Sequence, residues 1–572
     1  YDYPTAEDLA SVISDRTSGA HDACLSDDRE SACETLQRIA FTFLEPGTTS
    51  WDPTRSWDEI GFNSVDLMDL VDALNEELGT ELGPEVIFDF NTPRRLAEHL
   101  ESLVDELPES DVGIPSSAFS GSSCVSKDAV AIIGMSMRFA DLDDVSALES
   151  ALWQGESRIG ALSSRSAPNL DVSGGFIPSP ERFDAPFFGI SAREARRMDP
   201  QQRLLLEEAY RAVEDSGRAP DSLAGTSVGI FVGARSGDYG DQVFATDGPS
   251  SHVLLGNDMA VLSGRLANWL GVTGPCLTID AACASSLAAL HLASDSIRRG
   301  ECGLAIAAGV FVASPRFLSM ASAAGLLSTS GQCRPFSEEA DGMVLGDGAG
   351  VLVLKPLVRA IEDGDHIHAV VRASAMCHNG GAPSLMAPVT RSMRQMIVDL
   401  YRNSGTDITT VGCVEAQGSG SRIGDSAELA ALTAAFKDLG AAPRSCVLGS
   451  TKANVGHSVA ASGMAAIAKV ITAFRRRHLP EFVGVMTPHR RLGHDDSPFI
   501  VSSSVSAWPS QKVGPLRAGV NSYAFNGVNA HVILEEYVPS VKSIADDPPY
   551  LIPVSARTPS ALRSRLVDLR RW

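Results

Sequence analysis

Cysteine is sparse in this sequence and never stands in a metal-binding pattern. The 572 residues include 10 cysteines, none of them in a CxxC pair or at zinc-ligand spacing from histidines. The pattern excludes a zinc ribbon, and it also excludes the dense disulfide framework of small secreted domains. We therefore expect reduced thiols, no metal and a cytoplasmic protein.

Basic charge and long apolar runs are also lacking. Lysine and arginine number 47 against 71 acidic residues, which gives a formal net charge of -24. Such a surface cannot neutralise phosphates, so it argues against nucleic acid and against anionic membranes as partners. No apolar run reaches the roughly 18 residues of a membrane-spanning helix, and the acidic start does not resemble a signal peptide.

Residues 27–106 form an acidic segment with the pattern of helices. Apolar residues recur at helical spacing around 35–44 and 64–78, and a third helix is predicted over 93–103. Thr92 is a suitable N-cap for that third helix, and Pro93 suits its first turn. These patterns predict a small helical bundle.

A short repeat and a linker flank this bundle. Residues 1–13 and 88–100 share aromatic-Asp-aromatic-x-Thr followed by Leu-Ala at the same spacing. We expect residues 1–13 to be the C-terminal tail of a preceding bundle of the same kind, within a longer polypeptide; chance similarity is the alternative. Residues 107–127 are rich in Ser, Gly and Pro and are predicted to be a linker.

From residue 128 onward, short apolar strands alternate with helices. Strands are predicted at Ala129–Gly134, Val228–Gly233, Cys276–Asp280, Leu304–Val312, Gly350–Lys355, His368–Ser374, Val411–Glu415 and His531–Glu535. Helices are predicted at Pro200–Ser216, Ala281–Arg299 and Ala460–Arg477. Nearly continuous apolar strands with helices between them predict an α/β fold whose sheets are covered on both faces.

Cys283 is the first candidate for chemistry. A predicted buried strand ends at Asp280, and a helix rich in Ala, Leu and Ser begins close to Cys283. The positive end of the helix dipole favours a thiolate there, so we expect a lowered pKa and a nucleophilic thiol. The alternative is a small buried core cysteine with no chemical role.

The surrounding sequence resembles the β-ketoacyl synthases over residues 128–537. Ordered blocks carry this resemblance: Ala131–Ser136, Phe187–Ser191, Met198–Arg203, Leu277–Leu287, Cys333–Phe336, Ala340–Gly342, Val414–Ser421, Lys452–His457 and Asn529–Leu534. It implies a homodimeric thiolase fold of two similar halves stacked as five αβαβα layers. It also implies that residues 538–572 are the start of a post-ketosynthase linker region.

The same resemblance assigns the site residues. It implies that Cys283 is acylated, and that the backbone N–H groups of Cys283 and Phe525 form the oxyanion hole. His457 matches the second catalytic histidine, in an Asn-x-Gly-His motif that includes Asn454. Lys452 matches the supporting lysine, and Glu428 stands where a buried partner carboxylate is expected.

Gln417 departs from the family pattern, which has the first catalytic histidine at this position. Glutamine has hydrogen-bonding groups but cannot titrate, whereas imidazole can accept a proton or carry positive charge. Decarboxylative extension should suffer more than acylation of Cys283, so the chain resembles the non-elongating ketosynthases. Val528 and Asn526, beside the catalytic centre, also differ from the usual hydroxyl and small residues. The alternative is that Gln417 still supplies the hydrogen bond and condensation is only slower.

The front bundle has its own motif at Gly61–Leu67. It resembles the Gly-x-Asp-Ser-Leu attachment site of acyl carrier proteins, which implies a four-helix carrier bundle with 4′-phosphopantetheine on Ser64. Asn63 and Val65 stand where Asp and Leu are usual. An ordinary helix N-cap serine is the structural alternative.

Taken together, the resemblances imply a piece of a modular type I polyketide synthase. The expected partners are carrier domains upstream and downstream, acyl thioesters, a second copy of the chain and an acyltransferase acting in trans. Three functions stay open: a transacylating non-elongating enzyme, a decarboxylative condensing enzyme and a catalytically silent scaffold that docks carriers.

Overall fold

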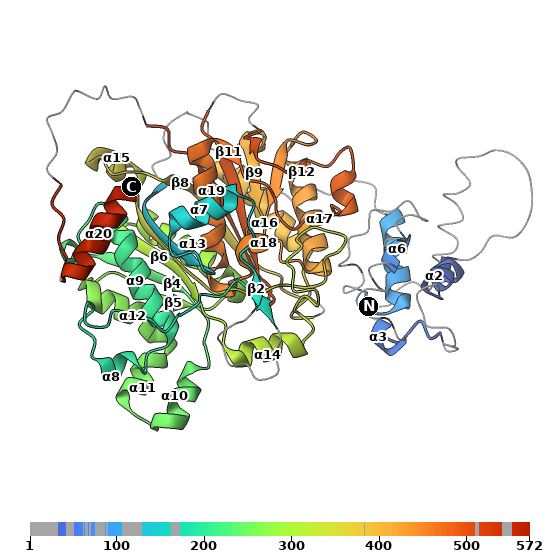
Figure 1. Ribbon diagram of the computed structural model, residues 1–572. Helices are drawn as coiled ribbons and strands as arrows, with labels where there is room; N and C mark the ends of the chain where they lie inside the picture. The colour runs from blue at the N-terminus through green and yellow to red at the C-terminus, as the bar shows by residue number, and fades with distance from the viewer. Residues whose placement is uncertain are drawn as a thin grey trace, which may run out of the picture. The chain divides into compact units, whose positions relative to one another are not determined.

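The computed structural model describes most of the chain from residue 129 onward and parts of the segment before it (Figure 1). The described residues are 32–41, 51–60, 62, 67, 70, 71, 73, 74, 86, 90–105, 129–161, 172–382, 384–509, 514–539, 552–556 and 558–571. The repeat at 1–13, the linker at 107–127 and Ser64 lie outside them.

The front segment contains three described helices and a small apolar core. The helices are α2 (Ala32–Phe41), α3 (Trp57–Ile60) and α6 (Pro93–Asp105). Thr92 caps α6 as predicted, because its Oγ1 accepts a hydrogen bond from the Arg95 N–H at 3.2 Å. Trp57 is buried and donates its Nε1–H to the Phe90 carbonyl at 3.0 Å, which connects α3 to the segment before α6.

The first half of the large α/β body is a sheet in the order β5–β4–β6–β7–β1. Its strands are β1 (Val130–Phe139), β4 (Val228–Gly233), β5 (Cys276–Ile279), β6 (Leu304–Phe311) and β7 (Gly348–Pro356). β4 runs parallel to β5 and β6, whereas β7 is antiparallel to both β6 and β1. If the five strands are numbered as they occur along the chain, their order across the sheet is third, second, fourth, fifth, first.

The second half repeats that arrangement in the order β10–β9–β14–β15–β8, with β12 added at the edge. Its strands are β8 (Ala369–His378), β9 (Val411–Glu415), β10 (Cys446–Gly449), β12 (Phe499–Val501), β14 (Arg517–Tyr523) and β15 (Val528–Glu535). β15 is antiparallel to both neighbours, as β7 is. β1 and β8 pair antiparallel, which joins the halves into one sheet within the described residues. The predicted duplicated, thiolase-like α/β fold is confirmed.

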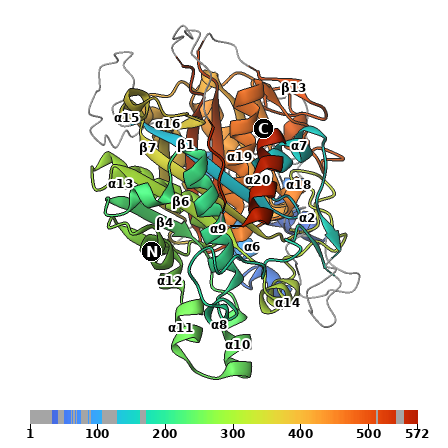
Figure 2. The ribbon, with the colours of Figure 1, turned by 60° about the vertical axis from the view of Figure 1, so that its left-hand side comes forward.

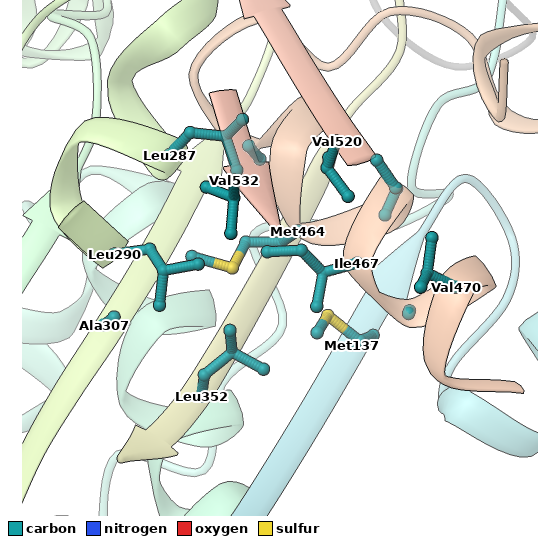
Figure 3. Packing of buried hydrophobic residues seen from close by; sticks show 14 of the residues in the cluster. Met137, Leu287, Leu290, Ala307, Leu352, Met464, Ile467, Val470, Val520 and Val532 are labelled. Carbon is teal, nitrogen blue, oxygen red and sulfur yellow. The ribbon is translucent and has the colours of Figure 1, made fainter. Parts of the chain in front are cut away.

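Two helices, labelled α13 and α19 in Figure 1 and Figure 2, contact strands of both halves and form the central layer between them. α13 (Ser285–Arg298) contacts strands β4, β6 and β7 of the first half and β8 and β15 of the second. α19 (Ser462–Arg476) contacts β1, β6, β7 and β14. Figure 3 shows the side chains that meet there: Met137, Leu287, Leu290, Ala307, Leu352, Met464, Ile467, Val470, Val520 and Val532.

Outer helices complete the five layers. α9 (Pro200–Asp215) and α12 (Met259–Leu270) pack on the first half, and α16 (Thr390–Ser404) and α17 (Arg422–Asp438) pack together on the second. The remaining elements are shorter: α7 (Val145–Trp153), β2 (Gly160–Ala161), β3 (Ser173–Gly174), α8 (Ala192–Ala195), η1 (Pro220–Leu223), α10 (Tyr239–Asp247), α11 (Ser251–Asn257), η2 (Ala282–Ala284), α14 (Pro315–Ala323), α15 (Leu357–Asp363), η3 (Ile408–Thr410), α18 (Lys452–Val455), η4 (Val459–Ala461), β11 (His478–Leu479), η5 (Arg490–Gly493) and β13 (Ser506–Ala507).

Residues Val538–Trp572 form a separate unit, in which the described helix is α20 (Pro559–Arg571). In the part of the chain that the structure describes, no helix is both long and apolar enough to cross a membrane. The same residues contain no group of three or more His, Cys, Asp or Glu side chains placed to hold a metal ion.

Candidate active site

Cys283 lies in the short helix η2 (Ala282–Ala284), between strand β5 and helix α13. The preceding residue, Ala282, has a φ of 49°, a left-handed conformation that costs a non-glycine residue energy. Local hydrogen bonds hold it: the Ala282 N–H donates to Asp280 Oδ1 at 2.9 Å, and Ser285 Oγ–H donates to the Ala282 carbonyl at 2.7 Å. The thiol is therefore positioned by a fixed turn at the start of the buried central helix.

Two glycines allow α13 to approach the sheet at this point. A Cβ on Gly233, at the end of β4, would lie 2.5 Å from the Ser285 carbonyl oxygen. A Cβ on Gly309, in β6, would lie 2.6 Å from Ser286 Cβ. Both contacts are closer than real Cβ atoms make, so the position of Cys283 depends on the absence of these side chains.

His457 meets Cys283 from the loop after α18 (Lys452–Val455). Its Nε2 lies 3.1 Å from Cys283 Sγ. The backbone on either side is fixed, because the His457 N–H donates to the Val344 carbonyl at 2.7 Å and the His457 carbonyl accepts from the Gly346 N–H at 3.0 Å. The structure thus brings together the residue that the resemblance implies is acylated and the one that it matches to the second catalytic histidine.

Burial makes this an uncharged pair. Burial raises the pKa of the Cys283 thiol to about 11, against the opposing effects of Lys452, Arg235 and the backbone N–H groups of Phe525 and Cys283. The lowered pKa expected from the helix N-terminus is therefore wrong, because desolvation outweighs the dipole. Burial, and then the charge of Lys452, lower the pKa of His457 well below its ordinary value. A neutral imidazole can accept the thiol proton.

The backbone around Phe525 lies beside the thiol. Phe525 follows β14, and its N–H is among the groups that lower the pKa of Cys283, as is the N–H of Cys283 itself. A tight turn fixes this segment: the Ala524 N–H donates to the Val528 carbonyl and the Gly527 N–H to the Ala524 carbonyl, both at 2.9 Å. Two N–H groups beside a nucleophile are the geometry that stabilises an oxyanion.

Glu428 holds the loop that carries Gln417. The Gln417 and Gly418 N–H groups donate to its two carboxylate oxygens, each at 2.8 Å, and Asn521 Nδ2 donates at 2.9 Å. Burial raises the pKa of Glu428, and these hydrogen bonds oppose the rise. The side chain of Gln417 is buried, and its Oε1 has no partner among the described residues.

Asp425 is a loop-holding residue that sequence reasoning missed. Its carboxylate accepts the Ser419 N–H at 2.9 Å, the Gly420 N–H at 3.1 Å and the Phe336 N–H at 3.0 Å. Burial raises its pKa to about 7. The available signal was its place in the first turn of α17, where a carboxylate faces free N–H groups.

Lys452 and Asn454 lie in α18, just before His457 in the chain. Lys452 is buried, which lowers its pKa, while the charges of Glu428 and Glu415 favour its protonated form. Asn454 does not face Cys283, because its Nδ2 donates to the Glu156 carbonyl at 2.9 Å. Asn454 thereby ties the loop before His457 to the segment after α7.

The large body matches known family models and structures. Residues 127–360 match the model of the β-ketoacyl synthase N-terminal domain, and residues 368–486 match that of the C-terminal domain. The ketosynthase from module 6 of the bacillaene synthase of Bacillus subtilis is 34% identical, with a TM-score of 0.68 over 72% of this chain and 72% of that one. This chain belongs to the β-ketoacyl synthase family. An oxazolomycin ketosynthase domain of Streptomyces albus is 30% identical, with a TM-score of 0.71 over 77% of this chain and 79% of that one.

Curated relatives of this ketosynthase are polyketide synthases. Polyketide synthase GfsA of Streptomyces halstedii is 35% identical over 98% of this chain. Pikromycin polyketide synthase component PikAII of Streptomyces venezuelae is 35% identical over 93% of it. The chain spans 8% of the first of these relatives and 15% of the second.

Two further family models match the flanks of the ketosynthase. Residues 42–100 match the phosphopantetheine attachment site, and residues 488–572 match the ketoacyl-synthetase C-terminal extension. A carrier domain of the type that is covalently modified by phosphopantetheine therefore precedes the ketosynthase. Ser64 falls within the matched range.

Proposed function

We propose that this ketosynthase accepts a polyketide acyl chain as a thioester on Cys283 and passes it on without lengthening it. The observation that carries the proposal is the uncharged pair of Cys283 Sγ and His457 Nε2 at 3.1 Å, with the Phe525 N–H beside the thiol. The pair suits acyl transfer between thiols, which needs a nucleophile, a base and oxyanion stabilisation.

Acylation of Cys283 begins with proton transfer to His457. His457 Nε2 takes the proton of Cys283 as Sγ attacks the thioester carbonyl carbon, and the resulting oxyanion accepts hydrogen bonds from the Cys283 and Phe525 N–H groups. When the tetrahedral intermediate collapses, the C–S bond to the donor thiol breaks, and that thiolate recovers the proton from His457. The reverse sequence with an acceptor thiol releases the chain.

Gln417 supports the non-elongating part of the proposal. Decarboxylating a malonyl thioester leaves an enolate, whose negative charge a protonated imidazole would stabilise, and the side chain of Gln417 cannot titrate or carry positive charge. Its backbone N–H donates to Glu428, which fixes the point from which the side chain extends. A general acid–base group is worth about 10²–10⁴ in rate, which is enough to suppress condensation.

The discriminating experiment offers the acylated ketosynthase a malonyl-loaded carrier. We expect acyl transfer to Cys283, seen by intact-protein mass, with little β-ketoacyl product. Gln417→His should then raise product formation by about 10²–10⁴ while Cys283 acylation changes little, because acylation uses His457. Cys283→Ala is the control that removes both.

A decarboxylative condensing function is the second candidate. It is favoured by the buried side chain of Gln417, whose Nε2–H groups can donate a hydrogen bond to an enolate oxygen. Steady β-ketoacyl formation by the native chain would establish this second function. Absence of any adduct on Cys283 would leave the third possibility, a silent scaffold for carriers.

The carrier domain and its partners form a second part of the proposal. We propose that Ser64 bears the phosphopantetheine arm, that carriers upstream and downstream exchange chains with Cys283, and that an acyltransferase acting in trans serves the assembly line. The described neighbours Phe62 and Leu70 are buried, and the Phe62 N–H donates to the Trp57 carbonyl at 2.9 Å, so the chain on both sides of position 64 is anchored. Loss of phosphopantetheinylation in Ser64→Ala, read by mass after treatment with a phosphopantetheinyl transferase, tests the attachment site.

We also propose a homodimer formed through the ketosynthase. β5 is the edge strand of the first half, and its residues Cys276 and Leu277 are exposed. An apolar edge strand with free backbone groups is a surface for pairing with a second copy.

A further inference from the structure

Arg235 is held in a fixed position beside the oxyanion loop. It follows β4, and its carbonyl accepts a hydrogen bond from Gln201 Nε2 at 3.1 Å. Its guanidinium carbon lies 5.3 Å from the ring centroid of Phe317 in α14 and 5.2 Å from that of Phe525. The cation is thus clamped between two aromatic rings from different parts of the chain, and one of these rings belongs to the residue whose N–H lies beside the thiol.

The clamped guanidinium has unused donors. Arg235 is partly buried, yet among the described residues its side chain donates no hydrogen bond and has no carboxylate within 4.0 Å. Two other arginines behave differently: the buried Arg203 donates to two backbone carbonyls and to Tyr239, and the partly buried Arg265 pairs with Glu194 at 2.7 Å. A positioned guanidinium with free donors is suited to bind a carboxylate through two parallel hydrogen bonds.

The place of Arg235 decides which anion fits. Its charge lies near enough to Cys283 to lower the pKa of the thiol, although burial outweighs that effect. The phosphate of a phosphopantetheine arm is at the opposite end of the arm from the thiol and cannot lie near Cys283 while the thioester reacts. The anion must therefore belong to the acyl chain, within a few carbons of the thioester carbonyl.

We infer that Arg235, clamped by Phe317 and Phe525, is a specificity-determining residue that binds a carboxylate on the acyl chain entering Cys283. This inference rests on the proposed acyl-transfer function of the site. It narrows the substrate class to acyl chains that end in, or branch to, a carboxylate close to the thioester.

The test compares acyl probes that differ only in charge. Succinyl, glutaryl and adipoyl thioesters of N-acetylcysteamine are each paired with the ω-amide of the same length, and Cys283 acylation is followed by intact-protein mass. We expect at least one carboxylate probe to acylate Cys283 about tenfold or more faster than its amide, because a hydrogen-bonded charge pair is worth that much. Arg235→Gln should bring the ratio close to one, and Arg235→Lys should keep part of it.

Arg316→Gln is the matched control variant. Arg316 precedes Phe317 in α14 but is exposed and pairs with Asp241, so its loss should leave the carboxylate-to-amide ratio unchanged. Equal rates for every probe pair in the native chain, or a preference that survives in Arg235→Gln, would overturn the inference. A preference restricted to malonyl thioester, run in parallel, would assign Arg235 to an extender unit and also overturn it. If the proposed acyl-transfer function itself is wrong, even butyryl thioester, which carries no charge, will give no adduct on Cys283, and this result distinguishes the two failures.

Discussion

At the scale of single residues, the sequence predicts which residues form the candidate site but not how burial changes their pKa values. The ordered motifs singled out Cys283 and His457, and the structure places their reacting atoms 3.1 Å apart. The sign of the pKa shift was wrong because a sequence shows that a thiol begins a helix but does not show how deeply that helix is buried. Arg235 was missed for a related reason, since its importance lies in a contact with Phe525 that is distant in sequence. Asp425 differs, because it holds the nearby Ser419 and Gly420, and its place in the first turn of α17 was the signal that could have found it.

The raised pKa of Cys283 predicts a distinctive pH profile for its alkylation. The thiolate is the reactive form, and it is the minor form up to about pH 11 in the folded protein. The rate of modification by iodoacetamide should therefore rise about tenfold per pH unit from pH 8 to pH 10. In the urea-unfolded chain the same cysteine should level off above its ordinary pKa of about 8.5. Peptide mapping gives the rate at Cys283, with circular dichroism to verify the fold, and a plateau below pH 8 in the folded protein would contradict the assignment.

At the scale of elements, most strands with a continuous apolar sequence were predicted, although the short apolar β10 was not. The strand predicted at Val411–Glu415 matches β9 residue for residue, and the helix predicted at Ala460–Arg477 contains α19. β14 was missed because its sequence, RAGVNSY, buries polar side chains such as Asn521. Asn521 is buried because it donates to Glu428, so a residue that makes the strand hard to recognise also supports the site.

The close approach of β4 and α13 at Gly233 should matter for both stability and acylation. In Gly233→Ala the new Cβ would lie 2.5 Å from the Ser285 carbonyl oxygen and 2.7 Å from the Ser286 nitrogen, so backbone must move. We expect the free energy of unfolding to fall by about 1–3 kcal/mol. We also expect Cys283 acylation to slow by about 10²-fold, because the start of α13 positions the thiol. Urea denaturation and acylation kinetics measure the two effects.

Gly264→Ala is the control for this substitution. Gly264 lies inside α12, and a Cβ there would have no atom within 4 Å. Removing a helical glycine should stabilise the protein by about 0.5–1 kcal/mol and leave acylation unchanged. If Gly233→Ala behaved like Gly264→Ala, the close approach of helix and strand would not be what positions Cys283.

At the scale of the whole molecule, the duplication of the fold was implied by the family resemblance but is not visible in the residues themselves. Both halves arrange five strands as third, second, fourth, fifth, first. The repetition lies in backbone connectivity, which many different apolar sequences satisfy. Each half supplies part of the site: β5 and α13 bring Cys283, whereas the loops after β9, α18 and β14 bring Gln417, His457 and Phe525.

At the scale of the whole molecule, β5 forms the exposed edge of the first half, and we expect two copies of the chain to associate through it. Leu277 is 49% exposed in this strand, whose outer edge has no partner among the described residues. A lysine on an edge strand opposes strand pairing, so Leu277→Lys should convert a dimer to a monomer in light scattering after size exclusion. Leu385→Lys is the control: it places the same charge on another exposed leucine, 68% exposed in the segment between β8 and α16, and this variant should stay dimeric.

A native chain that runs as a monomer, or a dimer that Leu277→Lys leaves intact, would contradict pairing through β5. Retained Cys283 acylation in a monomeric Leu277→Lys would further show that one copy holds the complete acyl-transfer site.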